Sequence, residues 1–368
     1  MADKPRVLVL TPDFPPAPGG IQLLIHRLAA TMSRLEPLAV APNRDGAAQF
    51  DATSTVAVHR VNEVAIDHRA TIARLNAASL AVAARYRPDV VLSAHIVLSP
   101  ATSLIRRRLK IPVVQYLHAN EVGARLRLAR FAISHADATI AVSRHTCQLA
   151  RSAGAHDSAL HRIPPGVDLP ERKIQERASR PTIITVARLE DRYKGHDTLV
   201  RAMPLILARV PDAQWVVIGG GPRREQLERL AEIHGVAESV RFLGQVANED
   251  RDAWLERAHV FAMPSRVPGG GLGGEGFGIV YMEASWRGLP VVAGNVGGAV
   301  DAVVDGETGL LVDANDPVSV SDAVTKLLVD TELSRRLGER GSERAKEFAW
   351  PLITRRVEDV LLAAAGSR

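Results

Sequence analysis

Two acidic residues, Glu275 and Glu283, are separated by seven residues in a glycine-rich segment, residues 269–292. Glycine lets backbone N–H groups approach a ligand without interference from a Cβ atom. The sequence after Gly278 predicts a short helix that ends at Gly288, followed by a buried strand. A helix N-terminus beside a glycine loop favours anions, whereas carboxylates suit sugar hydroxyls. The segment therefore predicts a site for a phosphorylated sugar or a nucleotide sugar.

Two basic residues follow another predicted strand, residues 182–187. Arg188 and Lys194 lie in a short loop that ends at Gly195. A guanidinium group binds two phosphate oxygens through its planar fork, and an ammonium group supplies a compact positive charge. A solvated loop is the alternative interpretation of two such residues. Their spacing directly after a strand favours a phosphate site.

The first part of the chain offers a second set of candidates. A strand at residues 6–10, a loop at 11–20 and a helix from Ile21 are typical of the start of a doubly wound α/β domain. Gly19 and Gly20 end this loop, and a turn that requires glycine would explain them equally well. His118 ends a later predicted strand and is followed by Glu121. A single histidine is more often structural, but the strand end favours a functional role.

The elements that must position these residues alternate between strands and helices. Strand-like runs occur at residues 56–58, 90–95, 113–118 and 139–143, and again at 182–187, 215–218 and 240–244. Alternation of this kind predicts parallel sheets covered by helices. A chain of 368 residues is long for a single core. We therefore expect two α/β domains, with the hinge at residues 163–168 and the polar stretch 171–180.

Composition excludes several classes of protein. The apolar fraction of 46% and the charged fraction of 24% are ordinary for a soluble globular protein. A single cysteine, Cys147, excludes an internal disulfide framework and fits a reducing compartment. No run approaches the roughly 20 apolar residues of a membrane span, so we expect a cytoplasmic protein. Sparse aromatic residues and the lack of a zinc or RNA-binding motif give no indication of nucleic acid.

A modest positive charge is compatible with two kinds of partner. The net charge of +5 suits a nucleotide diphosphate or an anionic membrane surface. Two basic runs, residues 106–110 and 125–130, predict either solvated helix faces or contact with anionic phospholipid. Both interpretations remain open, and the second would place the protein peripherally at the inner face of the membrane.

Two other patterns are set aside. The turn after residues 215–218 has Pro222, Arg223 and Arg224 where a dinucleotide fingerprint requires its third glycine, which argues against a nicotinamide dehydrogenase. Asp250 and Asp252 form a D-x-D pattern that could hold a metal ion. They fall in an acidic first turn of a predicted helix, so we expect no metal site and no cofactor.

The string GEGFGIVYMEASWRGLPVVAG resembles the retaining glycosyltransferases of family GT4, and the order of motifs is most similar to the phosphatidylinositol mannosyltransferase group. The resemblance covers essentially the whole chain and is strongest over residues 182–312. Two positions depart from the family pattern, since Pro165 replaces a usual asparagine and Val300 a usual proline.

The resemblance implies a GT-B fold, with two Rossmann-like domains facing a central cleft. Residues 1–168, joined by a C-terminal helix at 350–368, would form the acceptor-side domain, and residues 169–349 would bind the nucleotide sugar. It assigns Glu283 to the ribose hydroxyls, and Arg188 with Lys194 to the diphosphate. Sugar hydroxyls would bind Glu275 and His118. Backbone contacts to the donor are assigned to Gly19, Gly20, Gly276, Phe277, Gly278 and Ile279.

The implied function is transfer of a hexose, with retention at the anomeric carbon, to an acceptor hydroxyl. The resemblance favours mannose and GDP-mannose, while a UDP-sugar donor remains open. The acceptor would be a lipid or a small molecule. Two other classes remain as alternatives: a nucleotide-sugar epimerase of the same fold, which needs no acceptor, and a non-catalytic protein that binds sugar nucleotides.

Overall fold

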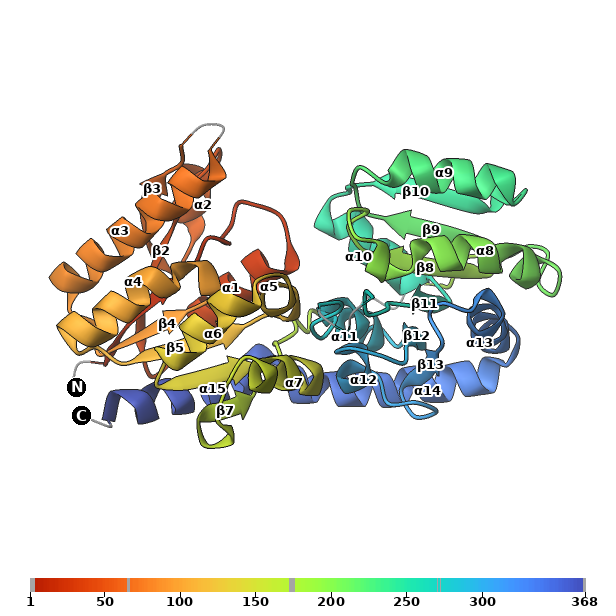
Figure 1. The fold of residues 1–368 in the computed structure, drawn as a ribbon. Helices are drawn as coiled ribbons and strands as arrows, with labels where there is room; N and C mark the ends of the chain where they lie inside the picture. Colours follow the sequence, from red (N-terminus) through yellow and green to blue (C-terminus); the bar gives the residue numbers. More distant parts are fainter. Residues whose placement is uncertain (1–3, 65–66, 172–175, 270, 272, 367–368) are drawn as a thin grey trace. The chain divides into compact units, whose positions relative to one another are not determined.

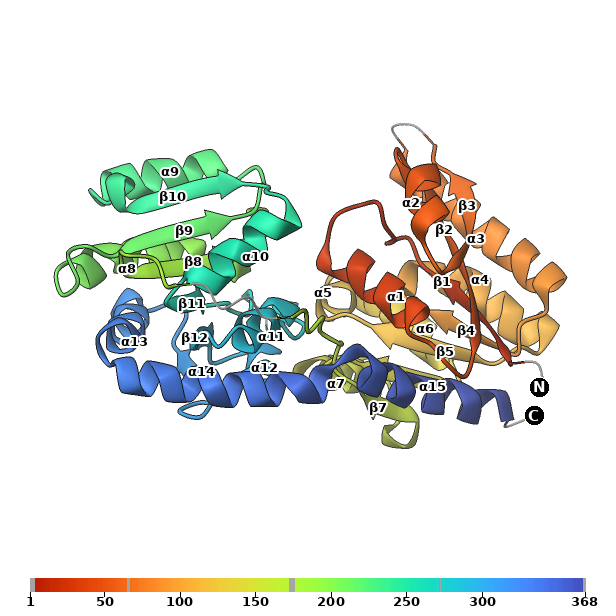
Figure 2. The same cartoon turned by 180° about the vertical axis from the view of Figure 1, so that it is seen from behind.

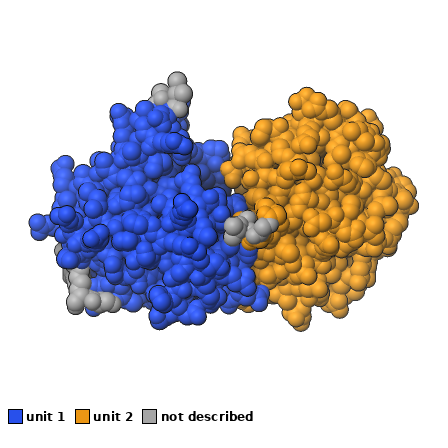
Figure 3. Space-filling model, viewed as in Figure 1, with its two compact units in different colours: residues 1–166, 349–368 blue, residues 167–348 orange. Residues whose placement is uncertain are grey.

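The computed structural model describes residues 4–64, 67–171, 176–269, 271 and 273–366. The chain divides into two compact units (Figure 3). Unit 1 consists of Met1–Gly166 and Ala349–Arg368, and unit 2 of Val167–Phe348. The first crossing between the units falls two residues before the end of the domain expected at residue 168. Part of the expected hinge, residues 172–175, lies outside the described residues.

Unit 1 is built on a seven-stranded sheet in the order β3-β2-β1-β4-β5-β6-β7, in which all neighbours are parallel (Figure 1). Its strands are β1 Arg6–Leu10, β2 Glu36–Asn43, β3 Ala57–Asn62, β4 Val90–Ser93, β5 Val113–Leu117, β6 Ala138–Ala141 and β7 Leu160–Arg162. Its helices are α1 Gly20–Ala30, α2 Ala47–Thr53, α3 His68–Tyr86, α4 Ser99–Leu104, α5 Ala119–Ala124, α6 Leu126–Ser134, α7 Arg144–Ser152 and α15 Trp350–Gly366.

Unit 2 repeats this architecture with a six-stranded parallel sheet in the order β10-β9-β8-β11-β12-β13 (Figure 2). Its strands are β8 Thr182–Val186, β9 Gln214–Ile218, β10 Val240–Gly244, β11 Val260–Met263, β12 Val291–Gly294 and β13 Gly309–Val312. Its helices are α8 His196–Leu207, α9 Arg224–Ile233, α10 Asn248–Arg257, α11 Ile279–Trp286, α12 Ala299–Ala302, α13 Pro317–Val329 and α14 Thr331–Ala345. Single helical turns occur at Ile96–Leu98, Ile105–Leu109, Asp157–Ala159, Arg192–Lys194, Ala237–Ser239 and Lys346–Phe348.

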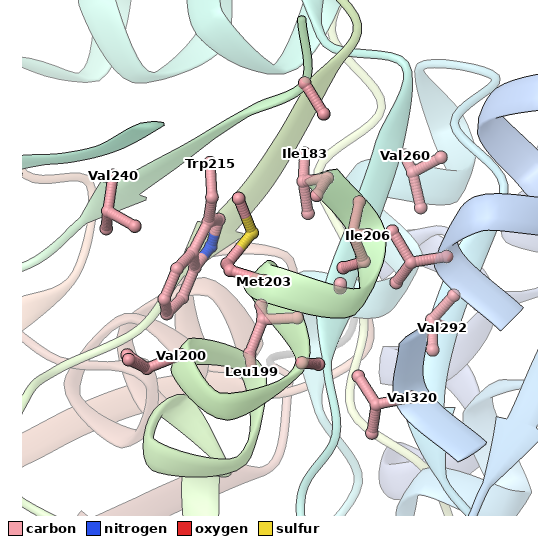
Figure 4. Close-up of a cluster of buried hydrophobic side chains, with 14 of the residues drawn as sticks. Ile183, Leu199, Val200, Met203, Ile206, Trp215, Val240, Val260, Val292 and Val320 are labelled. Carbon is pink, nitrogen blue, oxygen red and sulfur yellow. The ribbon is translucent and has the colours of Figure 1, made fainter. Parts of the chain in front are cut away.

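Both faces of the unit 2 sheet are buried, because successive strand residues point to opposite sides. In β9, Trp215 and Val217 join a core layer with α8 and α13, and Figure 4 shows this layer around the indole ring. Val216 and Ile218 join the opposite layer, which contains Tyr281 of α11. Strands buried on both faces read as continuous apolar runs, and this is why the sequence shows them clearly.

Each sheet has a point where the strand order reverses. In unit 1 the chain runs outward from β1 to β3 and returns on the other side of β1 with β4, and in unit 2 β8 and β11 are related in the same way. Ligands of doubly wound folds bind outside the carboxyl ends of the strands at this point. The Rossmann-like topology expected from the sequence is therefore confirmed in each unit.

The last helix, α15, completes unit 1. The Glu358 carboxylate is buried and accepts the backbone N–H groups of Ser33 and Arg34 at 2.8 and 2.6 Å. Thr354 shares a hydroxyl–hydroxyl hydrogen bond of 2.6 Å with Thr31. Among the helices that the structure describes, none combines the length and apolar character that a membrane crossing requires.

Candidate active site

Lys194 and Glu275, two of the residues predicted from the sequence, form an ion pair in unit 2. The Lys194 Nζ atom lies 2.5 Å from Glu275 Oε2, although 81 positions separate the residues in the chain. Only 16% of the Lys194 side chain and 11% of the Glu275 side chain are exposed. Burial alone would lower the pKa of Lys194, but the adjacent carboxylate outweighs it and raises that pKa to about 12. Lys194 is therefore a fixed positive charge at neutral pH.

The loop that carries Lys194 is fastened to the loop that follows β11. Gly195 has a φ of +78°, and a Cβ atom there would lie 2.0 Å from the carbonyl oxygen of Pro264. Only glycine allows this approach without displacing the backbone. Arg266 completes the connection, since its backbone N–H donates to Tyr193 O at 2.7 Å and its guanidinium binds both carboxylate oxygens of Asp197 at 2.8 Å.

Arg266 and Asp197 are positioning residues that sequence reasoning missed. Burial would raise the pKa of Asp197, but the hydrogen bonds from Arg266 outweigh burial and keep this pKa below its ordinary value. The sequence did offer one signal, their positions in the chain. Asp197 lies two residues after Gly195, and Arg266 lies three residues after the end of β11. An ion pair between two loops is not visible as a local pattern.

The glycine-rich segment leads into α11 as expected. Gly278 precedes the helix with a φ of +87°, and a Cβ atom there would lie 2.3 Å from the Tyr281 ring. The Tyr281 hydroxyl donates to Met263 O at 2.8 Å, which fixes α11 to the end of β11. Gly276, Phe277 and Ile279 lie in the described part of this turn, whereas Gly270 and Leu272 fall outside the described residues.

Glu283 is half-buried on α11, and its surroundings exclude the structural alternative for this residue. A local ion pair with Arg287, one turn away, would have consumed the carboxylate. Arg287 instead donates from Nη1 to the backbone oxygen of Glu283 at 3.0 Å and from Nη2 to Asp252 Oδ1 at 2.9 Å. No side chain in the described ranges is hydrogen-bonded to the Glu283 carboxylate. Burial raises the pKa of this carboxyl group, and Arg251 and Arg287 oppose the shift.

The D-x-D pattern belongs to this network. Asp252 lies on α10, and its Oδ1 atom accepts from Arg251 Nε and Nη2 at 2.9 and 2.8 Å in addition to Arg287. The Asp252 carboxylate thus binds the guanidinium groups of both Arg251 and Arg287. Within the described residues, no cluster of three or more His, Cys, Asp or Glu side chains could hold a metal ion.

Arg188 follows β8 in the same unit but is more exposed than the other candidates. More than half of its side chain, 56%, is accessible, and its guanidinium lies 3.2 Å from the exposed Glu190 carboxylate. Exposed pairs of this kind contribute little to stability and exchange readily. Arg188 therefore keeps a guanidinium that a bound anion could recruit.

In unit 1, Gly19 and Gly20 lie at the start of α1. Gly19 has a φ of +150°, and a Cβ atom there would lie 2.2 Å from Gln22 Oε1. Gln22 in turn donates to Asp13 Oδ1 at 2.9 Å and closes the loop. Gly20 has open space around its Cα atom. The first glycine is thus explained by the loop, whereas the second leaves the backbone at the helix start accessible.

His118 ends β5, and its imidazole is buried. Its Nε2 atom lies 3.2 Å from the carbonyl oxygen of Ala94, which can only accept, so Nε2 carries the proton and Nδ1 is an acceptor. Burial lowers the pKa of His118 to about 4, so the ring is neutral at physiological pH. His118 thus lies at the end of a strand, as the sequence predicts, at the carboxyl edge of the unit 1 sheet.

Glu121 holds this strand end together. Its carboxylate accepts the backbone N–H of His118 at 2.9 Å and that of Ile96 at 2.9 Å, which joins the segments after β4 and β5. Its Oε2 atom also lies 3.1 Å from Nδ1 of His95. Burial raises the pKa of Glu121 to about 8 against these hydrogen bonds. Glu121 therefore positions His118, and His95 is a neighbour that the sequence did not indicate.

Comparison with known proteins places these features in context. The family described as "Glycosyl transferases group 1" matches residues 169–344, and "Glycosyltransferase Family 4" matches residues 18–171. The chain is 36% identical to a GDP-mannose-dependent alpha-(1-6)-phosphatidylinositol monomannoside mannosyltransferase of Mycolicibacterium smegmatis, over 96% of the chain and 98% of the relative. The Corynebacterium glutamicum enzyme that acts on the monoacylated monomannoside is 32% identical over 98% of the chain and 99% of that enzyme.

Solved structures show the same fold. Sucrose-phosphate synthase of Thermosynechococcus elongatus superimposes with a TM-score of 0.83 at 22% identity, with full coverage of both chains. HepE of Anabaena, in complex with UDP and glucose, gives a TM-score of 0.80 at 19% identity over 98% of this chain and 100% of HepE. At these identities the likeness concerns the fold alone.

Proposed function

The chain belongs to glycosyltransferase family 4, and we propose that it transfers a mannosyl group from GDP-mannose to a hydroxyl of a phosphoinositide-type acceptor. The observation that carries the proposal is the similarity of essentially the whole chain, at 36% identity, to a GDP-mannose-dependent enzyme. The relatives that cover nearly the whole chain are mannosyltransferases, so an epimerase is not favoured.

Unit 2 supplies the donor site in this proposal. The unpaired Glu283 carboxylate accepts hydrogen bonds from the ribose hydroxyls, which donate but carry no charge. The backbone N–H groups at the start of α11 and the Lys194 ammonium receive the diphosphate. Arg188 exchanges Glu190 for a phosphate oxygen. The residues named here thus suit two parts of a nucleotide sugar, its ribose and its diphosphate.

The chemical step breaks the bond between the anomeric carbon and the diphosphate oxygen. Negative charge develops on the leaving nucleoside diphosphate, and Lys194 is a positive charge whose pKa of about 12 keeps it protonated. The acceptor oxygen forms the new bond and loses its proton to the leaving phosphate on the same face, which retains the anomeric configuration.

Glu275 acts on the sugar rather than as a nucleophile in this scheme. A double displacement needs a carboxylate free to attack the anomeric carbon. Glu275 is instead bound to Lys194 at 2.5 Å, which fixes its orientation and lowers its nucleophilicity. Its second oxygen accepts a sugar hydroxyl.

We assign the acceptor phosphate to a cavity of unit 1. A hollow of about 340 Å³ is lined by His68, Arg69, Ile72 and Arg125, three of which are basic. Arg125 begins one of the two basic runs, whereas Arg106 of the other run is engaged with Asp137 at 2.9 Å. A cavity without acidic residues suits an anionic headgroup, and recognition of such lipids would bring the protein to an anionic membrane surface.

Transfer of labelled mannose tests the proposal. The purified chain is incubated with GDP-[¹⁴C]mannose and vesicles of phosphatidylcholine with or without phosphatidylinositol or its monomannoside, and label in the organic phase is counted. We expect label only when GDP-mannose and an inositol lipid are both present. Equal labelling from UDP-sugars, or transfer only to water-soluble acceptors, would overturn the donor or acceptor assignment. A modified sugar nucleotide formed without acceptor would indicate an epimerase.

A further inference from the structure

A second cavity of unit 1 has a different chemical character. It is a groove of about 650 Å³ at the carboxyl ends of β2 and β3, lined by residues 16–18, Asn43, Arg44, Asp45, Asn62 and Glu63. Small-molecule sites commonly measure about 300–1,000 Å³. All strands of this sheet are parallel, so the groove shares an edge with the end of β5, where His118 lies.

The polar wall of the groove follows from strand register. Asn43 and Asn62 are the last paired residues of β2 and β3, and the Asn43 amide donates to Asn62 Oδ1 at 2.9 Å. This bond leaves Asn43 Oδ1 as an acceptor and Asn62 Nδ2 as a donor. One residue further, Arg44 Nε donates to Glu63 Oε1 at 3.0 Å. Adjacent donors and acceptors match neighbouring hydroxyls, each of which both donates and accepts.

The opposite wall is apolar and is fixed before a ligand arrives. Residues 16–18 present Pro, Ala and Pro side chains from the loop after β1. Arg60 anchors this loop, since its Nη2 donates to Pro15 O at 2.7 Å and its Nη1 donates to Pro42 O at 2.9 Å. Its guanidinium is held in turn by Asp51 at 2.7 Å and is only 11% exposed. A preformed wall reduces the ordering cost of binding.

Charge distinguishes the two cavities of unit 1. The groove contains one guanidinium group and two carboxylates, whereas the polar side chains of the other cavity, His68, Arg69 and Arg125, are all basic. The basic cavity therefore favours an anion, whereas the carboxylates of the groove repel one. A sugar ring has a polar hydroxylated edge and an apolar C–H face, which correspond to the two walls of the groove.

We propose that the groove between residues 16–18 and the ends of β2 and β3 binds a neutral hexosyl unit of the acceptor, separate from the unit that is modified. This inference rests on the proposed function, because it supposes that the acceptor is already glycosylated. The phosphate and the sugar of the acceptor would then occupy different cavities at one edge of unit 1.

The direct test measures binding of methyl α-mannopyranoside to the whole protein by saturation-transfer NMR in the presence of saturating GDP-2-deoxy-2-fluoromannose, a donor analogue that resists transfer. The analogue fills both the nucleotide and the sugar positions of the donor site, so the remaining signal reports other sugar sites. We expect a signal in the wild type and in the control Gln148→Ala, which removes an exposed amide on α7, and its loss in Asn62→Ala. A signal unaffected by Asn62→Ala, or displaced by 10 mM inorganic phosphate, would overturn the inference.

Kinetics separate this inference from the proposed function. Loss of one hydrogen-bonding side chain should raise the KM for the monomannoside about fivefold to tenfold in Asn62→Ala, with kcat unchanged. The KM for unglycosylated phosphatidylinositol should stay the same. Equal effects on both acceptors would contradict the groove assignment while leaving the transferase intact. Absence of transfer to either acceptor in the wild type would contradict the proposed function itself.

Discussion

Replacing Asp252 by Asn tests how Glu283 remains available to a ligand. Asp252 Oδ1 accepts three N–H groups, two from Arg251 and one from Arg287. The substitution Asp252→Asn preserves the shape of the side chain but removes its negative charge. The carboxylate one helical turn back from Arg287 is Glu283, so the guanidinium should pair with it in the variant.

The magnitude follows from the burial of the groups involved. Arg287 is 4% exposed and Asp252 is 30% exposed, so solvent screens the network only in part. A charge-assisted hydrogen bond contributes about 1.5–3 kcal/mol, which partial exposure reduces to about 1–2 kcal/mol. In the proposed donor site, a nucleotide must break the new pair before Glu283 can bind its ribose. The dissociation constant for GDP should therefore rise about fivefold to thirtyfold.

Titration calorimetry with GDP measures this effect in four proteins: wild type, Asp252→Asn, Arg287→Met and the double variant. The double variant should bind GDP as Arg287→Met does, because no guanidinium remains to occupy Glu283. The control Asp250→Asn removes a neighbouring charge from the same helix turn and should leave the dissociation constant unchanged. The reasoning is refuted if Asp252→Asn binds like the wild type, or if the double variant binds as weakly as Asp252→Asn.

Three further outcomes are expected. Lys194→Met should lower kcat about 100-fold to 1,000-fold in the mannose-transfer assay, since it removes the charge that we propose stabilises the leaving diphosphate, and an unchanged kcat would contradict that role. Gly195→Ala should weaken GDP binding and also lower the free energy of unfolding in urea, because a Cβ atom there would lie 2.0 Å from Pro264 O. The pKa of His118 is about 4 in the folded state against an ordinary 6.5, so the unfolded chain binds more protons between these values. Stability should therefore fall as pH decreases from about 6.5 to about 4, by up to about 3 kcal/mol from this residue, and His118→Asn should show a smaller fall in urea unfolding.

Local sequence patterns predicted the fold and most residues of the proposed donor site. Strands that are buried on both faces, such as β9 with Trp215, are visible as nearly continuous apolar runs because both of their faces pack against helices. The position of Gly278 before α11 was equally readable, since a positive φ requires glycine at the turn. The two acids were found from their seven-residue spacing in a glycine-rich segment, and the basic loop from its place directly after a strand.

Contacts between residues far apart in the chain could not be predicted from the sequence. Lys194 and Glu275 were each predicted, yet their ion pair joins loops 81 positions apart and depends on which strands are neighbours. The register of β2 and β3, which places Asn43 beside Asn62, gave no signal because neither residue belongs to a recognised pattern. Strand order and register are fixed by packing of whole layers, and a short window of sequence contains no information about the partner strand.

Glu283 shows which properties of a residue the sequence determines and which depend on the tertiary structure. The sequence by itself determined that a carboxylate stands on a short helix after a glycine turn, and it also placed Arg287 one turn away as a local partner. Only the tertiary structure decided between these roles, because α10 brings Asp252 within 2.9 Å of Arg287. A guanidinium pairs with the carboxylate that offers the better combination of distance and burial, and that choice depends on how the helices pack against the sheet.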